Sequence, residues 1–149
     1  MKVLRPCLGG LLAAAAILVP QQSDAASVRA GLGASYWLDQ QSALFDFTLG
    51  VEGHITGPIT AGARFGVALI TEGNDLAIPL DLTVRANLTS APIYLEGMVG
   101  PWIVLGRGDA LRVHAAFGFG FQRREFSIGL EAGYLDPSPI IGVKLGYRF

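Results

Sequence analysis

The chain has 149 residues, of which 51% are hydrophobic and only 15% are charged, and its formal net charge is −1. This length suits a single domain, and a charge balance so close to neutral offers no basic surface to nucleic acid. The longest apolar run, residues 8–19, is too short for a transmembrane helix, which needs roughly 20 apolar residues.

The amino-terminal segment is organised like a secretory signal peptide. Lys2 and Arg5 precede the apolar run, and Pro20 follows it. Small residues just before Ala26 favour cleavage at that point. We therefore predict a signal peptide over residues 1–25. An uncleaved amino-terminal anchor is the alternative, and the short apolar run argues against it.

Removal of this segment also removes the only cysteine, Cys7, whose position does not suit lipid attachment. The mature chain, residues 26–149, then has no thiol, disulfide or cysteine metal site. We expect no metal site and no cofactor.

Beyond the signal peptide, apolar and polar residues alternate with a period of two, which is typical of strands. In "FDFTLGVEGHIT", residues 45–56, the large apolar residues occupy one face, and the charged residues, threonines and histidine occupy the other. Each such segment is close to the roughly 9–11 residues that a tilted strand needs to cross a bilayer. Eight segments share the pattern: 27–38, 45–56, 59–70, 77–88, 93–105, 111–121, 126–135 and 140–149.

Short polar or Gly/Pro-containing turns separate these segments, so neighbouring strands are expected to pair as antiparallel hairpins. In chain order the turns are "DQQS" at 39–42, "GP" at 57–58, "TEGND" at 71–75, "TSAP" at 89–92, "GRGD" at 106–109, "QRRE" at 122–125 and "DPSP" at 136–139.

The volume of the side chains indicates which face is in contact with lipid. One face of each segment carries Phe, Leu, Ile, Val and Tyr, and the other carries glycines and most of the charges. An eight-stranded barrel has only enough interior space for ordinary inward side chains, so the bulky set would overfill it. We predict an all-β, eight-stranded antiparallel up-and-down transmembrane β-barrel. A soluble periplasmic barrel that binds a lipid in its core is an alternative with the two faces exchanged.

The inward face is predicted to hold a nearly neutral network of charges, because charges withdrawn from water are tolerated when they are paired. Counting from the turns places Glu52 opposite Arg64 and Arg85 opposite Glu96, and we predict both as cross-strand bridges. The whole predicted network is Arg29, Asp46, Glu52, Arg64, Asp81, Arg85, Glu96, Arg112, Glu131, Lys144 and Arg148.

Aromatic residues are placed as expected for the two girdles of a membrane barrel. With the amino terminus in the periplasm, one predicted girdle contains Phe119, Phe121, Phe126, Tyr147 and Phe149, and the other contains Tyr36, Phe45 and Tyr134. The fifth segment is irregular. The alternation of its side chains directs Trp102 inward, and Pro101 lies where the strand should pair with its neighbour. We expect a bulge there.

Together the signal peptide, the eight alternating segments and the terminal "YRF" resemble the small outer-membrane β-barrel proteins of Gram-negative bacteria, represented by OmpX and the OmpA transmembrane domain. In that family a last strand ending aromatic-x-Phe is the signal read by the barrel-assembly machinery, which implies this role for Tyr147 and Phe149. The resemblance also implies delivery by periplasmic chaperones, contact with outer-membrane lipid and lipopolysaccharide, and a monomeric state.

The predicted outer turns are tight, unlike the long loops of that family, and this argues against an adhesin. The Arg-Gly-Asp triplet at 107–109 lies in one of these turns. Such triplets arise readily in Gly-rich turns, and we do not assign integrin-type binding to it.

Candidate catalytic residues are few. His54 and His114 are the only mature histidines, and both are inward by parity. His114 could meet Glu131 across a hairpin, with Ser127 further along the same wall. A lipid A deacylase would use such a group of residues. Enzymes of that kind, however, carry the group on the lipid-facing side of the barrel, whereas these three residues are expected to point inward. We therefore expect a structural, non-enzymatic outer-membrane protein with a plugged lumen, and keep a lipid-modifying enzyme as the alternative.

Overall fold

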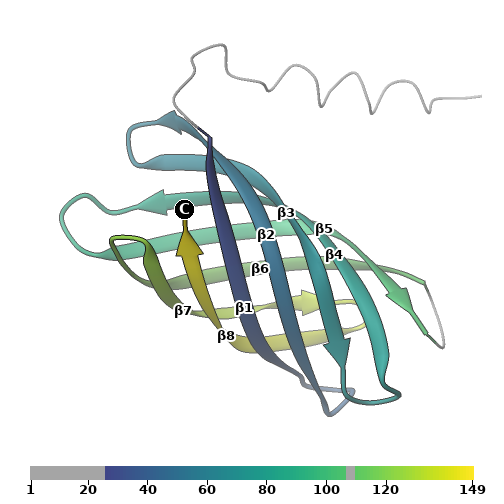
Figure 1. Ribbon diagram of the computed structural model, residues 1–149. Helices are drawn as coiled ribbons and strands as arrows, with labels where there is room; N and C mark the ends of the chain where they lie inside the picture. Colours follow the sequence, from purple (N-terminus) through teal and green to yellow (C-terminus); the bar gives the residue numbers. More distant parts are fainter. Residues whose placement is uncertain (1–25, 107–109) are drawn as a thin grey trace, which may run out of the picture.

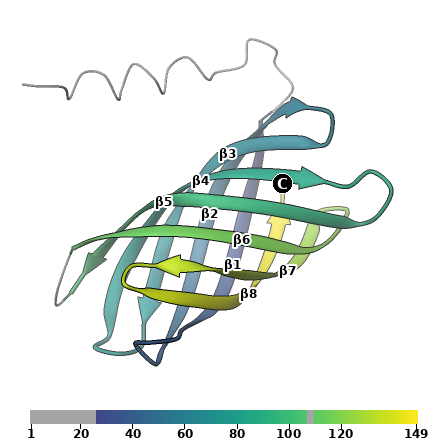
Figure 2. The same ribbon diagram turned by 180° about the vertical axis from the view of Figure 1, so that it is seen from behind.

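The computed structural model describes residues 26–106 and 110–149, which form eight antiparallel strands closed into a barrel. Each strand pairs with its neighbours in sequence, and β1 also pairs with β8 to close the wall (Figure 1, Figure 2). The predicted up-and-down barrel is confirmed. The strands are β1 (Ser27–Trp37), β2 (Ser42–Thr56), β3 (Ile59–Ile70), β4 (Asp75–Asn87), β5 (Ile93–Leu105), β6 (Leu111–Arg123), β7 (Phe126–Leu135) and β8 (Ser138–Arg148).

Two sequence predictions lie outside the described residues: the signal peptide over 1–25 and the Arg-Gly-Asp triplet at 107–109. Within the described ranges, no helix has the length and apolar character needed to cross a membrane.

The strand boundaries differ from the predicted ones mainly at the turns. β2 begins at Ser42, three residues earlier than predicted, because the chain reverses over 38–41 with Gln41 in the left-handed region at φ 52°. Arg124 has φ 55° in the turn between β6 and β7, so β6 continues to Arg123. Left-handed residues let the chain turn within a few positions, and this leaves more residues for the strands.

One register prediction is wrong. Glu52 lies opposite Gly62, and not opposite Arg64. The pairing of β2 with β3 shifts between His54 and Thr56, where a bulge lies. Counted from the pair of Thr56 and Ile59 next to the turn, Glu52 would lie opposite Ala63, so the predicted pairing with Arg64 is already out of register. The bulge displaces the pairing by one further residue, to Gly62.

The bulge predicted at Pro101 is also wrong. Pro101 lies opposite Val113, and Trp102 lies opposite Arg112, in the same register as the rest of β5 and β6. Proline removes one backbone donor from the ladder, and here the strand accommodates that loss without inserting a residue.

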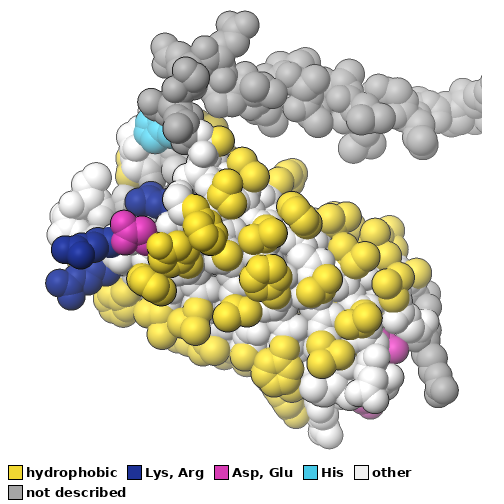
Figure 3. All heavy atoms as spheres, viewed as in Figure 1, with side chains coloured by type: hydrophobic (Ala, Val, Ile, Leu, Met, Phe, Trp, Pro, Cys, Tyr) yellow, Lys and Arg dark blue, Asp and Glu magenta, His cyan; other side chains and the backbone are white. Residues whose placement is uncertain are grey.

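The outer face of the barrel is apolar and the inner face is polar. Two consecutive residues of β4 illustrate the contrast, since Leu82 is 65% exposed and Asp81 is 2% exposed. Figure 3 shows hydrophobic side chains covering the middle of the visible face, with Lys and Arg side chains gathered at one end. This is the reverse of a soluble lipid-binding barrel, and it agrees with the predicted transmembrane arrangement.

Both predicted aromatic girdles face outward. We call the end of the barrel that holds Ser27 and Arg148 the terminal end, and the opposite one the far end. At the terminal end the ring of Tyr147 lies between those of Phe126 and Phe149, with centroids 4.9 Å apart in each pair. The backbone N–H of Phe149 donates to the carbonyl of Val28 at 2.9 Å. The last residue is therefore tied to β1.

The far end of the interior holds an apolar cluster that the sequence analysis did not predict. Its members come from strand ends that meet at this end, and they have the same parity as the charged lumenal residues. This far-end apolar cluster consists of Trp37, Leu44, Ala68, Ile70, Ala77, Trp102, Val104, Leu135 and Ile140.

Candidate functional site

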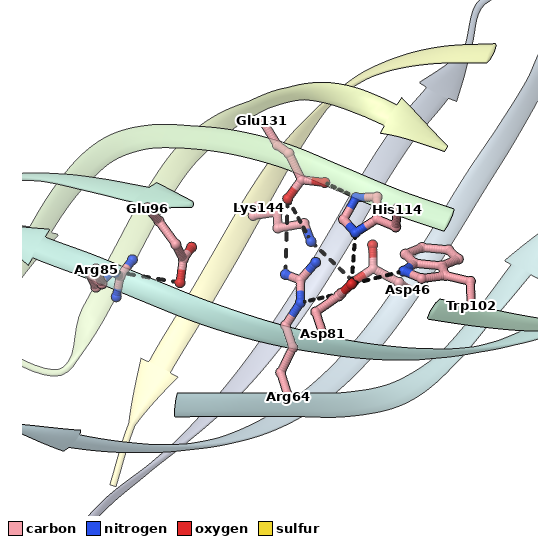
Figure 4. Close-up of polar contacts among 9 residues, drawn as sticks. All are labelled: Asp46, Arg64, Asp81, Arg85, Glu96, Trp102, His114, Glu131 and Lys144. Atoms are coloured by element: carbon pink, nitrogen blue, oxygen red, sulfur yellow. Dashed lines mark hydrogen bonds and ion pairs between the residues drawn. The ribbon is translucent and has the colours of Figure 1, made fainter. Parts of the chain in front are cut away.

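The most elaborate arrangement of polar side chains lies in the middle of the lumen (Figure 4). Six charged or titratable residues from six different strands converge there, and we call them the central cluster. Its members are Asp46, Arg64, Asp81, His114, Glu131 and Lys144.

Asp81 is the hub of one half of the central cluster. Its Oδ2 accepts a hydrogen bond from Arg64 Nε at 2.9 Å, and the two residues lie directly opposite each other on β3 and β4. Its Oδ1 lies 2.8 Å from His114 Nδ1 and accepts from Trp102 Nε1 at 3.3 Å. A buried carboxylate is tolerated when several donors face it, as they do here.

Glu131 is the hub of the other half. Its Oε2 lies 2.8 Å from Lys144 Nζ and 4.0 Å from an Arg64 nitrogen on the opposite side of the lumen. Its Oε1 lies 3.7 Å from His114 Nε2. The imidazole of His114 therefore lies between two carboxylates, and the predicted meeting of His114 with Glu131 is confirmed.

Glycines on intervening strands allow charges two strands apart to meet. Gly33 on β1 lies in register with Asp46 on one side and Lys144 on the other, and Lys144 Nζ is 3.9 Å from Asp46 Oδ1. Gly100 on β5 likewise lies between Asp81 and the His114 position of β6. Without a side chain on the middle strand, the flanking side chains reach each other.

A second group of charges lies nearer the terminal end. Arg29 Nε is 2.9 Å from Glu52 Oε1, and Arg29 Nη1 donates to Ser127 Oγ at 3.4 Å. Glu52 thus pairs across the β1–β2 hairpin with Arg29, in place of the predicted Arg64.

The predicted pair of Arg85 and Glu96 is confirmed, since the residues are in register and Arg85 Nε lies 3.9 Å from Glu96 Oε1. The Arg85 guanidinium carbon stacks 3.6 Å from the Tyr94 ring centroid, and Arg85 Nη1 donates to Gln122 Oε1 at 3.3 Å. Stacking and hydrogen bonding together hold this guanidinium in place.

Two members of the predicted network have other surroundings. Arg112 Nη1 donates to the backbone carbonyl of Asp136 at 2.8 Å, and its guanidinium lies 4.9 Å from the Trp37 ring centroid. Arg148 lies opposite Arg29 at the terminal end. Arg112 therefore joins the polar lumen to the far-end apolar cluster.

The residues considered for catalysis do not form one group. Ser127 contacts Arg29, whereas His114 contacts Asp81 and Glu131 in the central cluster. His54 is exposed near the end of β2, where its Nε2 lies 2.8 Å from the carbonyl oxygen of Gly57 in the following turn. Its predicted inward position is wrong: His54 still pairs with Thr60, but the pairing of β2 with β1 ends at Glu52, so His54 lies beyond the closed wall and is exposed.

No group of three or more His, Cys, Asp or Glu side chains within residues 26–106 and 110–149 is arranged to hold a metal ion. The cations of the central cluster occupy the space between its carboxylates. The arrangement is thus suited to mutual neutralisation of charge inside a narrow barrel.

Some of these contacts could have been found from the sequence. Ile70 and Asp75 close the turn between β3 and β4, and counting from them puts Arg64 opposite Asp81. No sequence pattern predicts that Trp102 donates to Asp81. The same is true of the contact between the Tyr94 ring and Arg85. Both contacts depend on how the side chains lean across the lumen.

Comparison with known proteins gave matches only at the level of structure. No protein-family model matches the chain. No curated protein matches its sequence.

Solved structures do match. The designed transmembrane barrel TMB2.3 matches with a TM-score of 0.65 at 13% identity, over 86% of this chain and 98% of that one. The outer membrane enzyme PagL matches with a TM-score of 0.58 at 16% identity, over 83% of this chain and 98% of that one. The Yersinia pestis outer membrane protein Ail matches with a TM-score of 0.55 at 13% identity, over 84% of this chain and all of that one.

At these identities the likeness establishes the fold and nothing finer. The chain has the fold of small Gram-negative outer-membrane β-barrels. The same fold carries an enzyme and other proteins, so it does not assign an activity.

Proposed function

We propose that the chain is a small structural protein of the outer membrane, which is secreted through the inner membrane by the signal peptide over 1–25. The apolar outer face is the observation that carries this proposal. Large hydrophobic side chains are exposed around the whole barrel, while the charges are inside or at the two ends. Such a surface is stable in lipid and would aggregate in water.

The proposed lumen is plugged. The far-end apolar cluster fills one end of the interior, and the central cluster crosses its middle. Eight strands enclose little more space than inward side chains occupy. A closed lumen favours a role in envelope integrity over the passage of solutes.

The proposed partners are outer-membrane lipid and lipopolysaccharide, with periplasmic chaperones and the barrel-assembly machinery acting during biogenesis. Tyr147 and Phe149 are the proposed assembly signal, and the protein is proposed to be a monomer. The outward placement of Tyr147 near the end of β8 and of Phe149 directly after it, with their rings in edge-to-face contact, supports this role.

A lipid-modifying enzyme is the weaker candidate. A hydrolase of that kind needs its nucleophile within hydrogen-bond reach of a base. Ser127 Oγ accepts a hydrogen bond from Arg29, and both ring nitrogens of His114 face carboxylates. We therefore propose that the protein is not an enzyme.

Gel mobility of the washed outer-membrane fraction tests the proposal, with unheated samples compared against boiled ones. The full-length protein should be in this fraction and show a heat-shifted band, and the chain lacking Phe149 should lose the band. Phe121→Ala, which removes another exposed aromatic from the same girdle, is the matched control and should keep it.

Refolding in detergent without cellular machinery separates the two roles of Phe149. The truncated chain should refold there if Phe149 is an assembly signal, and should fail if the residue is needed for the fold itself. A protein recovered in the osmotic-shock fluid, with no heat shift, would contradict the membrane location.

A further inference from the structure

A small cavity lies inside the barrel between the central cluster and the terminal end. Its volume is about 50 Å³, which is room for a few water molecules or one small ion and excludes a sugar or an acyl chain. Six charged side chains contribute to its wall: Arg29, Arg64, Arg85 and Lys144, with Glu52 and Glu96.

Cations predominate around this cavity. Only Glu52 and Glu96 line it among the carboxylates, and Glu52 is engaged by Arg29 at 2.9 Å. Glu96 lies 3.9 Å from Arg85, which is longer than a hydrogen bond. Arg85 Nε is thus paired with Glu96 in charge but donates no hydrogen bond to it.

The other two cations share their carboxylates with a third group. Arg64 is paired with Asp81 and Lys144 with Glu131, but both carboxylates also face the ring nitrogens of His114. Asp46 also lies 3.9 Å from Lys144, so the lumenal carboxylates balance the cations in number. Asp46, Asp81 and Glu131 do not line the cavity, however, and its own wall carries four cations and two carboxylates.

Two buried donors at the cavity have no acceptor among the residues that the structure describes. They are Arg64 Nη2 and Arg85 Nε, whose side chains are 10% and 3% exposed. A buried donor without an acceptor is costly, and buried guanidinium groups normally find an oxygen, a water or an anion.

We propose that this cavity binds one small inorganic anion, a halide or a compact oxyanion, between the guanidinium groups of Arg64 and Arg85 and the ammonium of Lys144. Water molecules would satisfy the free N–H groups, but the excess of cations over carboxylates on the cavity wall favours an anion at this position. An anion accepts charge-assisted hydrogen bonds from these groups, which are stronger than those a water molecule would accept. The proposal concerns the lumen alone and does not depend on the cellular location of the barrel.

NMR titration of the full mature barrel in detergent micelles tests the proposal. The Nε–Hε signals of the arginines are followed while bromide, and separately inorganic phosphate, replaces gluconate at constant ionic strength. Gluconate is the balancing anion because it is too large for the cavity. The signals of Arg64 and Arg85 should shift and saturate with at least one of the two anions. Arg123 and Arg124, outside the lumen, should show no saturable shift.

Arg85→Gln should abolish the saturable shift of Arg64, and Arg124→Gln, in the turn between β6 and β7, should leave it unchanged. Each variant is first checked for the heat-shifted band of a folded barrel. If Arg85→Gln does not fold, the wild-type titration decides alone. Absence of any saturable shift with both anions would mean that the cavity holds water only, and would overturn the proposal.

Discussion

His114 on β6 and Asp81 on β4 meet across a strand that lies between them, with Nδ1 2.8 Å from Oδ1. Contact at this distance is possible because β5 presents Gly100 at the position that separates them. In the same way, Gly33 on β1 leaves space for Asp46 and Lys144 to approach each other from the two flanking strands. Glycines in this lumen thus determine which charges pair.

Replacement of Gly100 should therefore be damaging. In Gly100→Ala the new Cβ would overlap the backbone carbonyl of Leu80, which cannot move aside as a flexible side chain can. We expect a loss of about 1–3 kcal/mol in the free energy of unfolding, the usual cost of overpacking. Urea unfolding of the refolded barrel in detergent measures it. Gly97→Ala, on the same strand with open space at its Cβ position, should be nearly neutral, and equal losses would contradict the explanation.

Asp81→Asn should be strongly destabilising, because it leaves the charge of Arg64 buried without its partner. Breaking a buried pair in this way costs about 3–5 kcal/mol. Glu72→Gln, in an exposed turn, is the control and should change the free energy of unfolding by less than about 0.5 kcal/mol.

The double variant Arg64→Gln with Asp81→Asn gives a sharper test of the same pair. Its loss of unfolding free energy should be smaller than the sum of the two single losses by about 1–3 kcal/mol, because replacing one residue already leaves the other without its partner. Strict additivity would show that the two side chains contribute independently.

An arginine on the outer face should be tolerated only near the rims. Leu82, in the middle of β4, is 65% exposed, and Leu82→Arg should cost about 2–4 kcal/mol in a bilayer. Leu76→Arg, near the far end of the same strand, should cost only about 0–1 kcal/mol. Guanidinium unfolding from lipid vesicles measures both. The two variants would cost the same if this face were not in the membrane.

The purified protein should not conduct ions. The far-end apolar cluster and the central cluster leave little space for water along the axis. Planar-bilayer recordings should stay at baseline while a general porin, added afterwards, produces regular steps. Steady single-channel currents from the protein would contradict the proposed plug.

Expression of the protein should leave the lipid A profile of the host unchanged. Mass spectra of lipid A from cells with the gene, without it, and with Ser127→Ala should be the same. A new lipid species with the wild-type gene that disappears in Ser127→Ala would establish the enzymatic alternative.

The sequence by itself determined the class of fold and the orientation of its faces. A two-residue period places Phe45, Phe47 and Leu49 on one face, and an eight-stranded barrel is too narrow to hold such residues inside. Because the turns are short, each strand is expected to pair with the strands next to it in the sequence. These are local properties of the chain, so they could be predicted without tertiary contacts.

Only the tertiary structure decided which charges meet across the lumen, whereas partners on adjacent strands, such as Arg85 and Glu96, could be counted from the turns. A bulge between His54 and Thr56 set Glu52 opposite Gly62, and closure of the barrel brought Arg64 within 4.0 Å of Glu131 on the opposite wall. Contacts across the lumen depend on register, closure and the glycines between strands acting together. Parity places a side chain inside the barrel, and the closed barrel then determines what it meets.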